Sequence, residues 1–261
     1  MTTVADILSF IETIAPPCMA ESWDNVGLLC GRKSKEVRRI LVALDPFRNV
    51  IDAAISEKAD LIVTHHPLIF RDPLMAVNED TETGRCVLTL IEHGIAAINA
   101  HTNLDQAPGG VNDVLAQTLG LSDIRIITPV PGEVPYGLLR MGIVEEQPLE
   151  QFLPTVRTNL KCDGLRYVSG NGTVHRVAVG GGSCADGMFE AKAAGCDTLV
   201  TSDAKYNQFR TAFELGLNLI DAGHFHTENP VVAVLAEKLR AAFPDVEVKL
   251  CESHWDCMKY Y

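Results

Sequence analysis

An internal repeat constrains the fold of this chain more than any other feature of its sequence. Three segments recur in the same order: residues 39–43, 60–64 and 92–100 align with residues 176–180, 197–201 and 214–222. The first two pairs are 137 residues apart and the third is 122 apart, because the first copy has a longer loop near residues 68–83. Any two strand–helix–strand units share residue types, but the matched order favours a duplication.

Each copy has the pattern of strand, helix, strand, helix and strand. The predicted strands are short runs of Ile, Val and Leu, and Gly94 and Gly216 stand where a helix should end. Alternation of this kind predicts right-handed crossovers and a parallel sheet. We therefore expect an α/β protein with two similar, internally duplicated α/β domains, mostly parallel sheets, and a metal site at the carboxyl ends of the strands.

The segment between the two copies differs in composition. Residues from about 125 to 170 contain several Pro and Gly residues and β-like stretches at 136–144 and 165–169. This composition predicts that a second domain begins here. We expect residues 1–125 and 220–261 to form the first α/β domain and residues 126–219 to form a second, inserted α/β domain. The C-terminal helix should begin at Asn229-Pro230.

Imidazole and carboxylate side chains follow three of the predicted strands, namely His65 and His66, then Asp105, then His224 and Glu228. Each motif alone has a structural explanation, since an Asp suits a turn and a Glu suits the start of a helix. Ligands of open α/β sheets bind beyond the carboxyl ends of the strands. All five residues are therefore candidate metal ligands.

The number and chemistry of these residues indicate two divalent transition-metal ions per chain. Mixed imidazole and carboxylate ligation suits Zn, Mn, Fe, Co or Ni rather than Ca or Mg. Five ligands exceed what one open tetrahedral site uses, whereas a bridging carboxylate between two ions about 3.5–4 Å apart would use them all. Such a pair supports hydrolysis without a protein nucleophile.

The remaining histidines and a glycine-rich turn are weaker candidates. His226 lies between proposed ligands and could contact them rather than an ion. His93, His175 and His254 have ordinary structural explanations. The turn at residues 180–183 (GGGS) resembles a phosphate-binding loop but has no P-loop lysine.

Charge and cysteine usage narrow the partners and the compartment. A formal net charge of −12 opposes binding of nucleic acid or a membrane surface, and it also opposes an anionic substrate unless bound cations reverse the local field. No apolar run reaches the roughly 18–20 residues of a membrane span. The eight cysteines form no CxxC pair, which favours reduced thiols. We expect a soluble, cytoplasmic protein.

Four motifs, in order and spanning about residues 4–251, resemble those of the GTP cyclohydrolase 1 type 2 homologue family, also described as interacting-factor-three-like proteins. The motifs are SWDNVGL at 22–28, THHPLIF at 64–70, HTNLD at 101–105, and DAGH at 221–224 followed by Thr227-Glu228. In one departure, Thr201-Ser202-Asp203 stands where the family pattern has Thr, Gly and an acidic residue. The role of that loop therefore stays open.

The resemblance implies a dinuclear metal centre in which His65 and Asp105 hold one ion and His66 and His224 hold the other. Glu228 would bridge the two ions, and His101 would stand close by. In a metal-dependent hydrolase, His101 is the candidate catalytic residue, as a proton carrier. The resemblance also implies two similar α/β domains and a ring-shaped homohexamer with its sites facing an inner cavity.

The family name implies a metal-dependent hydrolase that opens the imidazole ring of guanine in a nucleotide. An alternative is a non-enzymatic, metal-dependent oligomeric binding or regulatory protein. A third possibility is that the histidines are structural and bind no metal.

Overall fold

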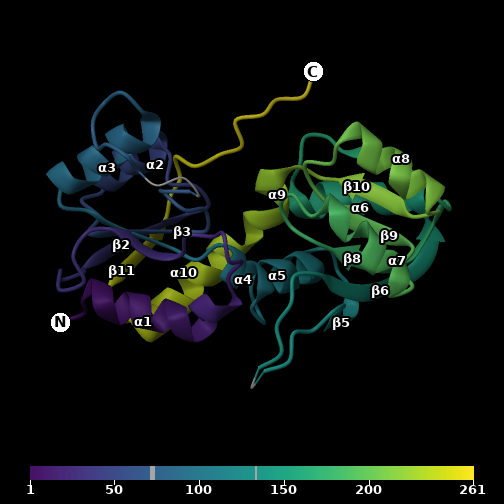
Figure 1. Ribbon diagram of the computed structural model, residues 1–261, viewed down its shortest axis with the longest axis horizontal. Coiled ribbons are helices and arrows are strands. Elements are labelled where there is room, and N and C mark those ends of the chain that lie inside the picture. The colour runs from purple at the N-terminus through teal and green to yellow at the C-terminus, as the bar shows by residue number, and fades with distance from the viewer. Residues whose placement is uncertain (71–73, 133) are drawn as a thin grey trace. The chain divides into compact units, whose positions relative to one another are not determined.

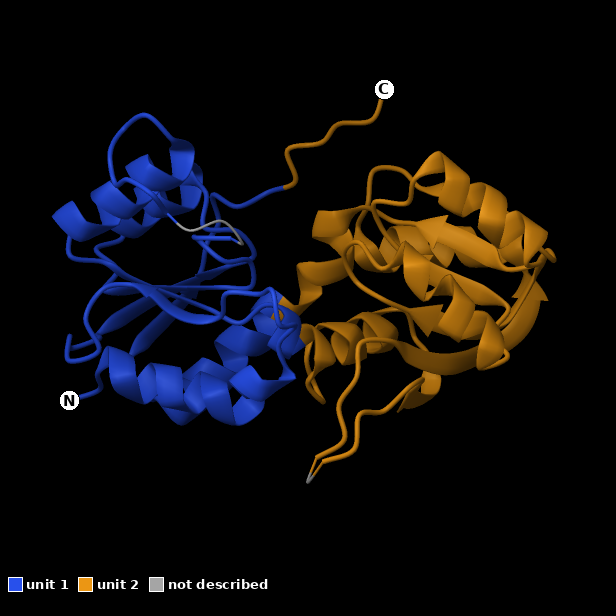
Figure 2. Ribbon diagram, viewed as in Figure 1, with its two compact units in different colours: residues 1–104, 232–255 blue, residues 105–231, 256–261 orange. Residues whose placement is uncertain are grey.

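The computed structural model describes residues 1–70, 74–132 and 134–261, which divide into two compact units (Figure 1). Unit 1 comprises residues 1–104 and 232–255, and unit 2 comprises residues 105–231 and 256–261 (Figure 2). The expected borders at 125/126 and 219/220 both fall inside unit 2. The reason is packing, because Leu115 and Ile220 lie in the same buried cluster of that unit.

Unit 1 contains a five-stranded sheet in the order β1-β4-β3-β2-β11. The strands are β1 (Gly27–Cys30), β2 (Arg39–Ala43), β3 (Leu61–Thr64), β4 (Ala96–Asn99) and β11 (Glu247–Leu250). All neighbours pair in parallel except β1, which lies antiparallel to β4 at one edge. The helices that accompany this sheet are α1 (Val4–Ile14), η1 (Pro17–Met19), α2 (Arg48–Ser56), α3 (Glu82–Glu92), the start of α4 (Thr102–Gln106) and most of α10 (Pro230–Ala242).

The helices of unit 1 follow from their apolar faces and caps. In α1, Thr3 and Asp6 form a capping box that satisfies free amides at the helix start. Helices α2 and α3 bury one face each against the sheet, with Ile51 and Leu90 in the same cluster as Ile62 of β3. Figure 1 shows α2 and α3 on one side of this sheet and α1 and α10 on the other. The C-terminal helix begins at Pro230, as the sequence predicts.

Unit 2 contains a six-stranded sheet in the order β5-β6-β8-β9-β10-β7. Its strands are β5 (Ser122–Ile126), β6 (Arg140–Pro148), β7 (Arg166–Val168), β8 (Thr173–Val179), β9 (Thr198–Thr201) and β10 (Asn218–Asp221). Its helices are α5 (Val111–Thr118), α6 (Leu149–Leu160), η2 (Ala185–Gly187), α7 (Met188–Ala193), α8 (Tyr206–Glu214) and α9 (His224–Glu228). Helices α5 and α6 share one buried cluster with the sheet, and α7 and α8 share another.

The two sheets share a duplicated centre. Ile40 pairs with Leu61 in unit 1, and Val177 pairs with Thr198 in unit 2, so each pairing is shifted by 137 residues. The next pairing also matches, because Leu61 lies opposite Ala96 and Thr198 lies opposite Asn218. These registers agree with the duplication that the sequence predicts. Residues 71–73 of the longer loop in the first copy lie outside the described residues.

In the sheet of unit 2, only the three central strands pair in parallel. Strands β8, β9 and β10 are parallel, whereas β5, β6 and β7 pair antiparallel with their neighbours. The β-like stretches predicted near 136–144 and 165–169 supply two of these outer strands. The α/β class is confirmed, and the sheet of unit 2 is mixed rather than mostly parallel.

Candidate metal centre

Three histidines converge at the carboxyl ends of neighbouring strands in unit 1. His65 and His66 follow β3, and His101 follows β4, which is paired in parallel with β3. Their ring centroids are 4.9 Å apart for His65 and His66, 5.2 Å for His65 and His101, and 5.5 Å for His66 and His101. One ligand atom from each ring lies within 4.8 Å of the others. This spacing is suitable for holding a metal ion.

Neighbouring residues on a regular strand point to opposite faces, so the His65-His66 pair needs a break in the β geometry. Strand β3 ends at Thr64, and the Thr64 hydroxyl donates a 2.7 Å hydrogen bond to the carbonyl of His66. This bond closes a turn directly beyond the strand. Both rings therefore lie in the same cluster.

Each of these imidazoles is held through Nδ1 by an acceptor. His65 Nδ1 lies 2.9 Å from the carbonyl oxygen of Ala100, and His66 Nδ1 lies 2.6 Å from an Asp45 carboxylate oxygen. His101 Nδ1 lies 2.8 Å from a carboxylate oxygen of Asp24. Because a carbonyl or carboxylate oxygen only accepts, Nδ1 carries the proton in each ring. The neutral ring then has its lone pair on Nε2, the tautomer that a metal ligand needs.

Asp24 and Asp45 are charged partners of these rings. Burial disfavours the Asp24 carboxylate, but hydrogen bonds from His101 and Thr102 outweigh burial and hold its pKa well below the usual value. The same balance lowers the pKa of Asp45, which is hydrogen-bonded to His254 and His66. A charged carboxylate raises the basicity of the imidazole that it holds.

Unit 2 carries the second set of candidate ligands. His224 and Glu228 lie four residues apart on α9, so both face the same side of the helix. His224 Nε2 lies 3.1 Å from a carboxylate oxygen of Glu228, and its Nδ1 lies 2.8 Å from Asp203. His224 is therefore held in the same way as the histidines of unit 1. The sequence left the role of the 201–203 loop open, and in the structure Asp203 of that loop holds Nδ1 of His224, a candidate ligand.

The glycine turn after β8 makes room for Glu228. A Cβ atom at Gly182 would lie 2.2 Å from Glu228 Oε1, and Gly182 has a φ of +63°. The Gly182 amide donates to the Thr227 hydroxyl at 3.1 Å, and the Gly181 amide donates to Asn112 at 2.7 Å. Since both amides bond to side chains of this unit, the turn serves the carboxylate rather than a phosphate.

Asp105 is buried in unit 2, and Asn112 donates a 3.1 Å hydrogen bond to its backbone carbonyl. Burial raises the pKa of the Cys184 thiol, and the nearby Asp105 and Glu228 carboxylates raise it further. The Cys184 thiol is therefore kept protonated next to two carboxylates. All eight cysteines are free thiols.

The predicted residues thus fall into two sets, with His65, His66 and His101 in unit 1 and Asp105, His224 and Glu228 in unit 2. His226 contacts Asp256 at 3.2 Å. Sequence reasoning missed the roles of Asp24, Asp45 and Asp203. Asp45 follows the carboxyl end of β2, so the rule that located the other candidates could also have found it.

Two exposed aromatic side chains adjoin the histidines of unit 1. Trp23 is 43% exposed and Phe70 is 45% exposed, and their rings meet edge to face with centroids 5.9 Å apart. The His101 ring lies 6.2 Å from Trp23 and 5.7 Å from Phe70. Exposed aromatic rings beside polar ligands are typical of binding sites.

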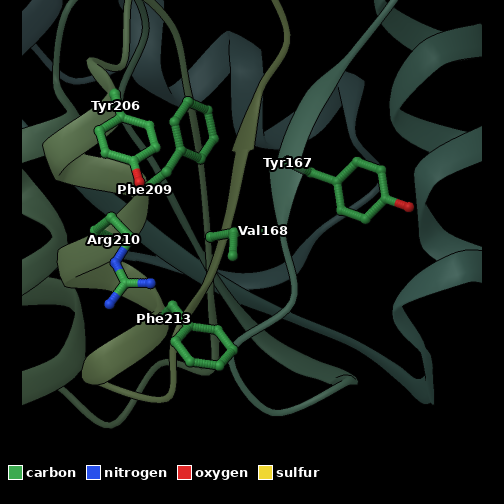
Figure 3. A pocket seen from close by; sticks show the side chains of 6 residues that line it. All are labelled: Tyr167, Val168, Tyr206, Phe209, Arg210 and Phe213. Carbon is green, nitrogen blue, oxygen red and sulfur yellow. The ribbon is translucent and has the colours of Figure 1, made fainter.

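A separate cavity of about 290 Å³ lies in unit 2 between α8 and β7 (Figure 3). Its lining residues are Tyr167, Val168, Tyr206, Phe209, Arg210 and Phe213. None of them is a candidate ligand, and none has a carboxylate or an imidazole. Within the described part of the chain, no helix has the length and apolarity to cross a membrane.

Comparison with known proteins places this chain in a family. The sequence matches the Duf34/NIF3 (NGG1p interacting factor 3) family over residues 2–256. A GTP cyclohydrolase 1 type 2 homolog of Clostridium perfringens (strain 13 / Type A) is 37% identical over 237 residues, covering 90% of each chain. Its counterpart in Clostridium acetobutylicum is 35% identical over 242 residues, covering 92% of this chain and 90% of that protein.

Solved structures agree with this assignment. A Bacillus cereus protein related to NIF3 superposes with a TM-score of 0.93 at 26% identity, covering 100% of this chain and 99% of that chain. A Staphylococcus aureus protein gives a TM-score of 0.90 at 29% identity with the same coverage. The chain belongs to the Duf34/NIF3 family.

Proposed function

We propose that this protein is a metal-dependent hydrolase with a dinuclear centre formed by His65, His66, Asp105, His224 and Glu228. In this proposal His65 and Asp105 hold one ion, His66 and His224 hold the other, and Glu228 bridges them. The observation that carries the proposal is the shared orientation of the histidines, each bonded through Nδ1 to an acceptor. Donors of this kind suit Zn, Mn, Fe, Co or Ni.

Each set of ligands contributes a different chemistry. Unit 1 supplies imidazoles, and unit 2 supplies the carboxylates of Asp105 and Glu228 together with His224. Asp105 lies on α4, which begins directly after His101.

When bound, the two ions would polarise the substrate and lower the pKa of a water molecule. His101 is the proton carrier in this proposal, because Asp24 holds its Nδ1 at 2.8 Å and leaves Nε2 to exchange a proton with the reacting group. Trp23 and Phe70 would contact an aromatic part of the substrate. A nucleotide is the proposed substrate class, in keeping with the name of the Clostridium perfringens relative.

We also infer that the chain assembles with itself as a ring-shaped homohexamer and works in the cytoplasm. The assembly is inferred from the resemblance of its motifs to those of the family. The compartment is inferred from eight free thiols, which are typical of reducing surroundings.

Metal analysis of protein purified without added metal tests the centre directly. We expect about two equivalents of transition metal in the wild type, as two-ion sites hold. His65→Ala and Glu228→Ala should each lose metal, whereas His175→Ala on β8 should retain it, because that ring is hydrogen-bonded to the carbonyl of Val144 and is not a candidate ligand. Less than about half an equivalent in the wild type, or unchanged content in both ligand variants, would contradict the proposed centre.

Hydrolysis is tested separately from metal binding. Purified protein with added Mn, Zn or Fe should hydrolyse GTP or another member of a nucleotide and phosphoester panel, and His65→Ala should abolish this activity. His101→Gln should retain its metal and lose about 10²–10⁴-fold in kcat, the usual contribution of a proton carrier. Metal binding without turnover of any substrate would favour the non-enzymatic, metal-dependent binding protein.

A further inference from the structure

The C-terminal segment of the chain returns to the carboxyl end of β2 in unit 1. His254 Nε2 lies 3.1 Å from one carboxylate oxygen of Asp45, and the His254 side chain is 6% exposed. The other carboxylate oxygen of Asp45 lies 2.6 Å from Nδ1 of His66. Asp45 is therefore held from both sides, with a candidate metal ligand on one side and a C-terminal histidine on the other.

The two contacts of Asp45 depend on each other geometrically. A carboxylate that bonds through only one oxygen can rotate about its side-chain torsions, whereas one bonded through both oxygens has a single orientation. Because Asp45 is the partner of His66 Nδ1, its orientation sets the plane of the His66 ring and the direction of Nε2. Partners of this kind fix the orientation of a metal-bound histidine and tune its basicity.

From this geometry we infer that His254 is a positioning residue that orients His66 through Asp45 for metal binding. The inference rests on the proposed function, because it requires His66 to hold an ion. His254 touches neither ion nor substrate in this arrangement. Its effect should therefore fall on the ion that His66 holds and spare the ion that His65 holds.

Other contacts hold the C-terminal segment in place independently of His254. The Cys251 amide donates to the carbonyl of Val42 at 2.9 Å, and the Asn49 side-chain amide donates to the carbonyl of Ser253. Substitution of His254 should consequently leave the segment attached to unit 1. Asn49→Ala loosens the segment without removing a contact of Asp45, so it is a matched control.

The test is a cobalt titration of full-length, metal-free protein, followed by the absorption spectrum of bound Co²⁺ and by competition with a chelator. His254→Ala should lower the affinity for one of the two Co²⁺ ions by about tenfold, which is the low end of the effect of removing a group that hydrogen-bonds to a metal ligand. The absorption spectrum of that ion should also change. The second equivalent should bind as in the wild type. His254→Gln keeps an N–H donor near the same position and should restore most of the affinity.

Asn49→Ala should bind both equivalents within about twofold of the wild type, since it leaves the groups behind the ligands intact. Thermal unfolding of the metal-free variants, followed by circular dichroism, separates misfolding from a local effect. Wild-type affinity for both equivalents in His254→Ala would overturn the inference alone. Equal weakening in His254→Ala and Asn49→Ala, or no recovery in a folded His254→Gln, would also overturn it. A wild type that binds no cobalt would overturn the metal centre and this inference together.

Discussion

Asp203 combines an unfavourable backbone conformation with a contact to a candidate ligand. Its φ of +52° lies in the left-handed region, which Asp tolerates better than most residues do. Its carboxylate lies 2.8 Å from His224 Nδ1. A strained residue that orients a ligand is the kind of position where stability and function are in conflict.

Replacing Asp203 should change stability and metal affinity in opposite directions. Asp203→Gly relieves the left-handed strain, so thermal stability of the metal-free protein should stay equal or rise. Loss of the carboxylate should weaken metal binding about 10–100-fold in a chelator competition assay. Asp123→Gly is the matched control, because Asp123 has a φ of +51° and lies exposed on β5. A similar loss of metal affinity in both variants would contradict this role for Asp203.

Gly182 should be intolerant of a side chain. Gly182→Ala places a Cβ atom against Glu228, so the carboxylate must move. We expect a loss of about 1–3 kcal/mol in unfolding free energy, together with lower metal content. Gly216→Ala shares the φ of +63°, but its nearest contact would be the end of Lys192 at 3.8 Å. It should lose stability through backbone strain alone and retain metal, and equal metal loss in both variants would refute the steric argument.

At the scale of elements, the duplication is visible in individual hydrogen bonds. The Asp60 carboxylate accepts from the amides of Arg38 and Arg39 at 2.8 and 3.1 Å. The Asp197 carboxylate accepts from the amides of His175 and Arg176 at 3.0 and 2.7 Å. Each Asp directly precedes one central strand and accepts from backbone amides in, or directly before, the strand beside it.

The two copies have diverged at the opposite ends of the same strands. His66 and Asp203 occupy equivalent positions 137 residues apart, and so do Asp45 and Gly182. In unit 1 the imidazole comes from the end of β3 and its carboxylate partner from the end of β2. In unit 2 the carboxylate comes from the end of β9 and the imidazole from α9. Both copies therefore place an imidazole–carboxylate pair at these strand ends, but the two side chains come from different elements in each copy.

The role of Asp60 predicts a pH-dependent loss of stability. Burial opposes its charge, but hydrogen bonds from Arg38 and Lys35 outweigh burial and lower its pKa. A carboxyl group with a lowered folded pKa stabilises the fold above its unfolded pKa of about 3.9, and this contribution is lost as pH falls through the folded value.

Asp60→Ala should therefore lose about 1–3 kcal/mol at pH 7, because the backbone amides of Arg38 and Arg39 lose their acceptor at roughly 0.5–1.5 kcal/mol for each hydrogen bond. The difference from the wild type should shrink below about pH 4 in urea unfolding experiments. Asp52→Ala, at an exposed position on α2, should change the stability by less than about 0.5 kcal/mol. A difference between Asp60→Ala and wild type that is constant from pH 7 to pH 3 would contradict this account.

At the scale of the whole molecule, the charge balance favours bound cations. The formal net charge is −12, and four carboxylates contact histidines of the candidate site, namely those of Asp24, Asp45, Asp203 and Glu228. Divalent ions would offset part of this charge.

Removing metal should lower the melting temperature. A ligand at about 100 times its Kd stabilises a protein by about 2.7 kcal/mol, which corresponds to roughly 5–10 °C for a chain of this size. Differential scanning fluorimetry before and after chelation measures the shift. The double variant His65→Ala/Glu228→Ala should have the same melting temperature before and after chelation. If the wild type loses its metal and its melting temperature does not change, the metal centre does not stabilise the fold.

The proposed homohexamer has a direct measurement. Light scattering should give a mass about six times the chain mass of 28.4 kDa. Repeating the measurement after chelation shows whether the ions also support the assembly. A mass equal to that of a single chain at micromolar concentration would refute the proposed assembly.

The sequence alone determined the repeated strand–helix pattern and the residues at the ends of its strands. Buried strands require uninterrupted apolar runs, and these runs locate β2, β3, β4 and their copies in unit 2 without knowledge of their partners. The positions of His65, His66, His101, Asp105, His224 and Glu228 relative to those strands followed from the same runs.

Only the tertiary structure decided which carboxylates hydrogen-bond to the histidines and where the chain divides into compact units. Asp24 and His101 are 77 residues apart, and His254 and Asp45 are 209 apart, so no local pattern connects them. Likewise, α5 and β10 pack into one core, so unit 2 begins at Asp105 rather than at the composition change near residue 125. Long-range contacts of this kind depend on how the strands are ordered in each sheet, which periodicity along the chain does not encode.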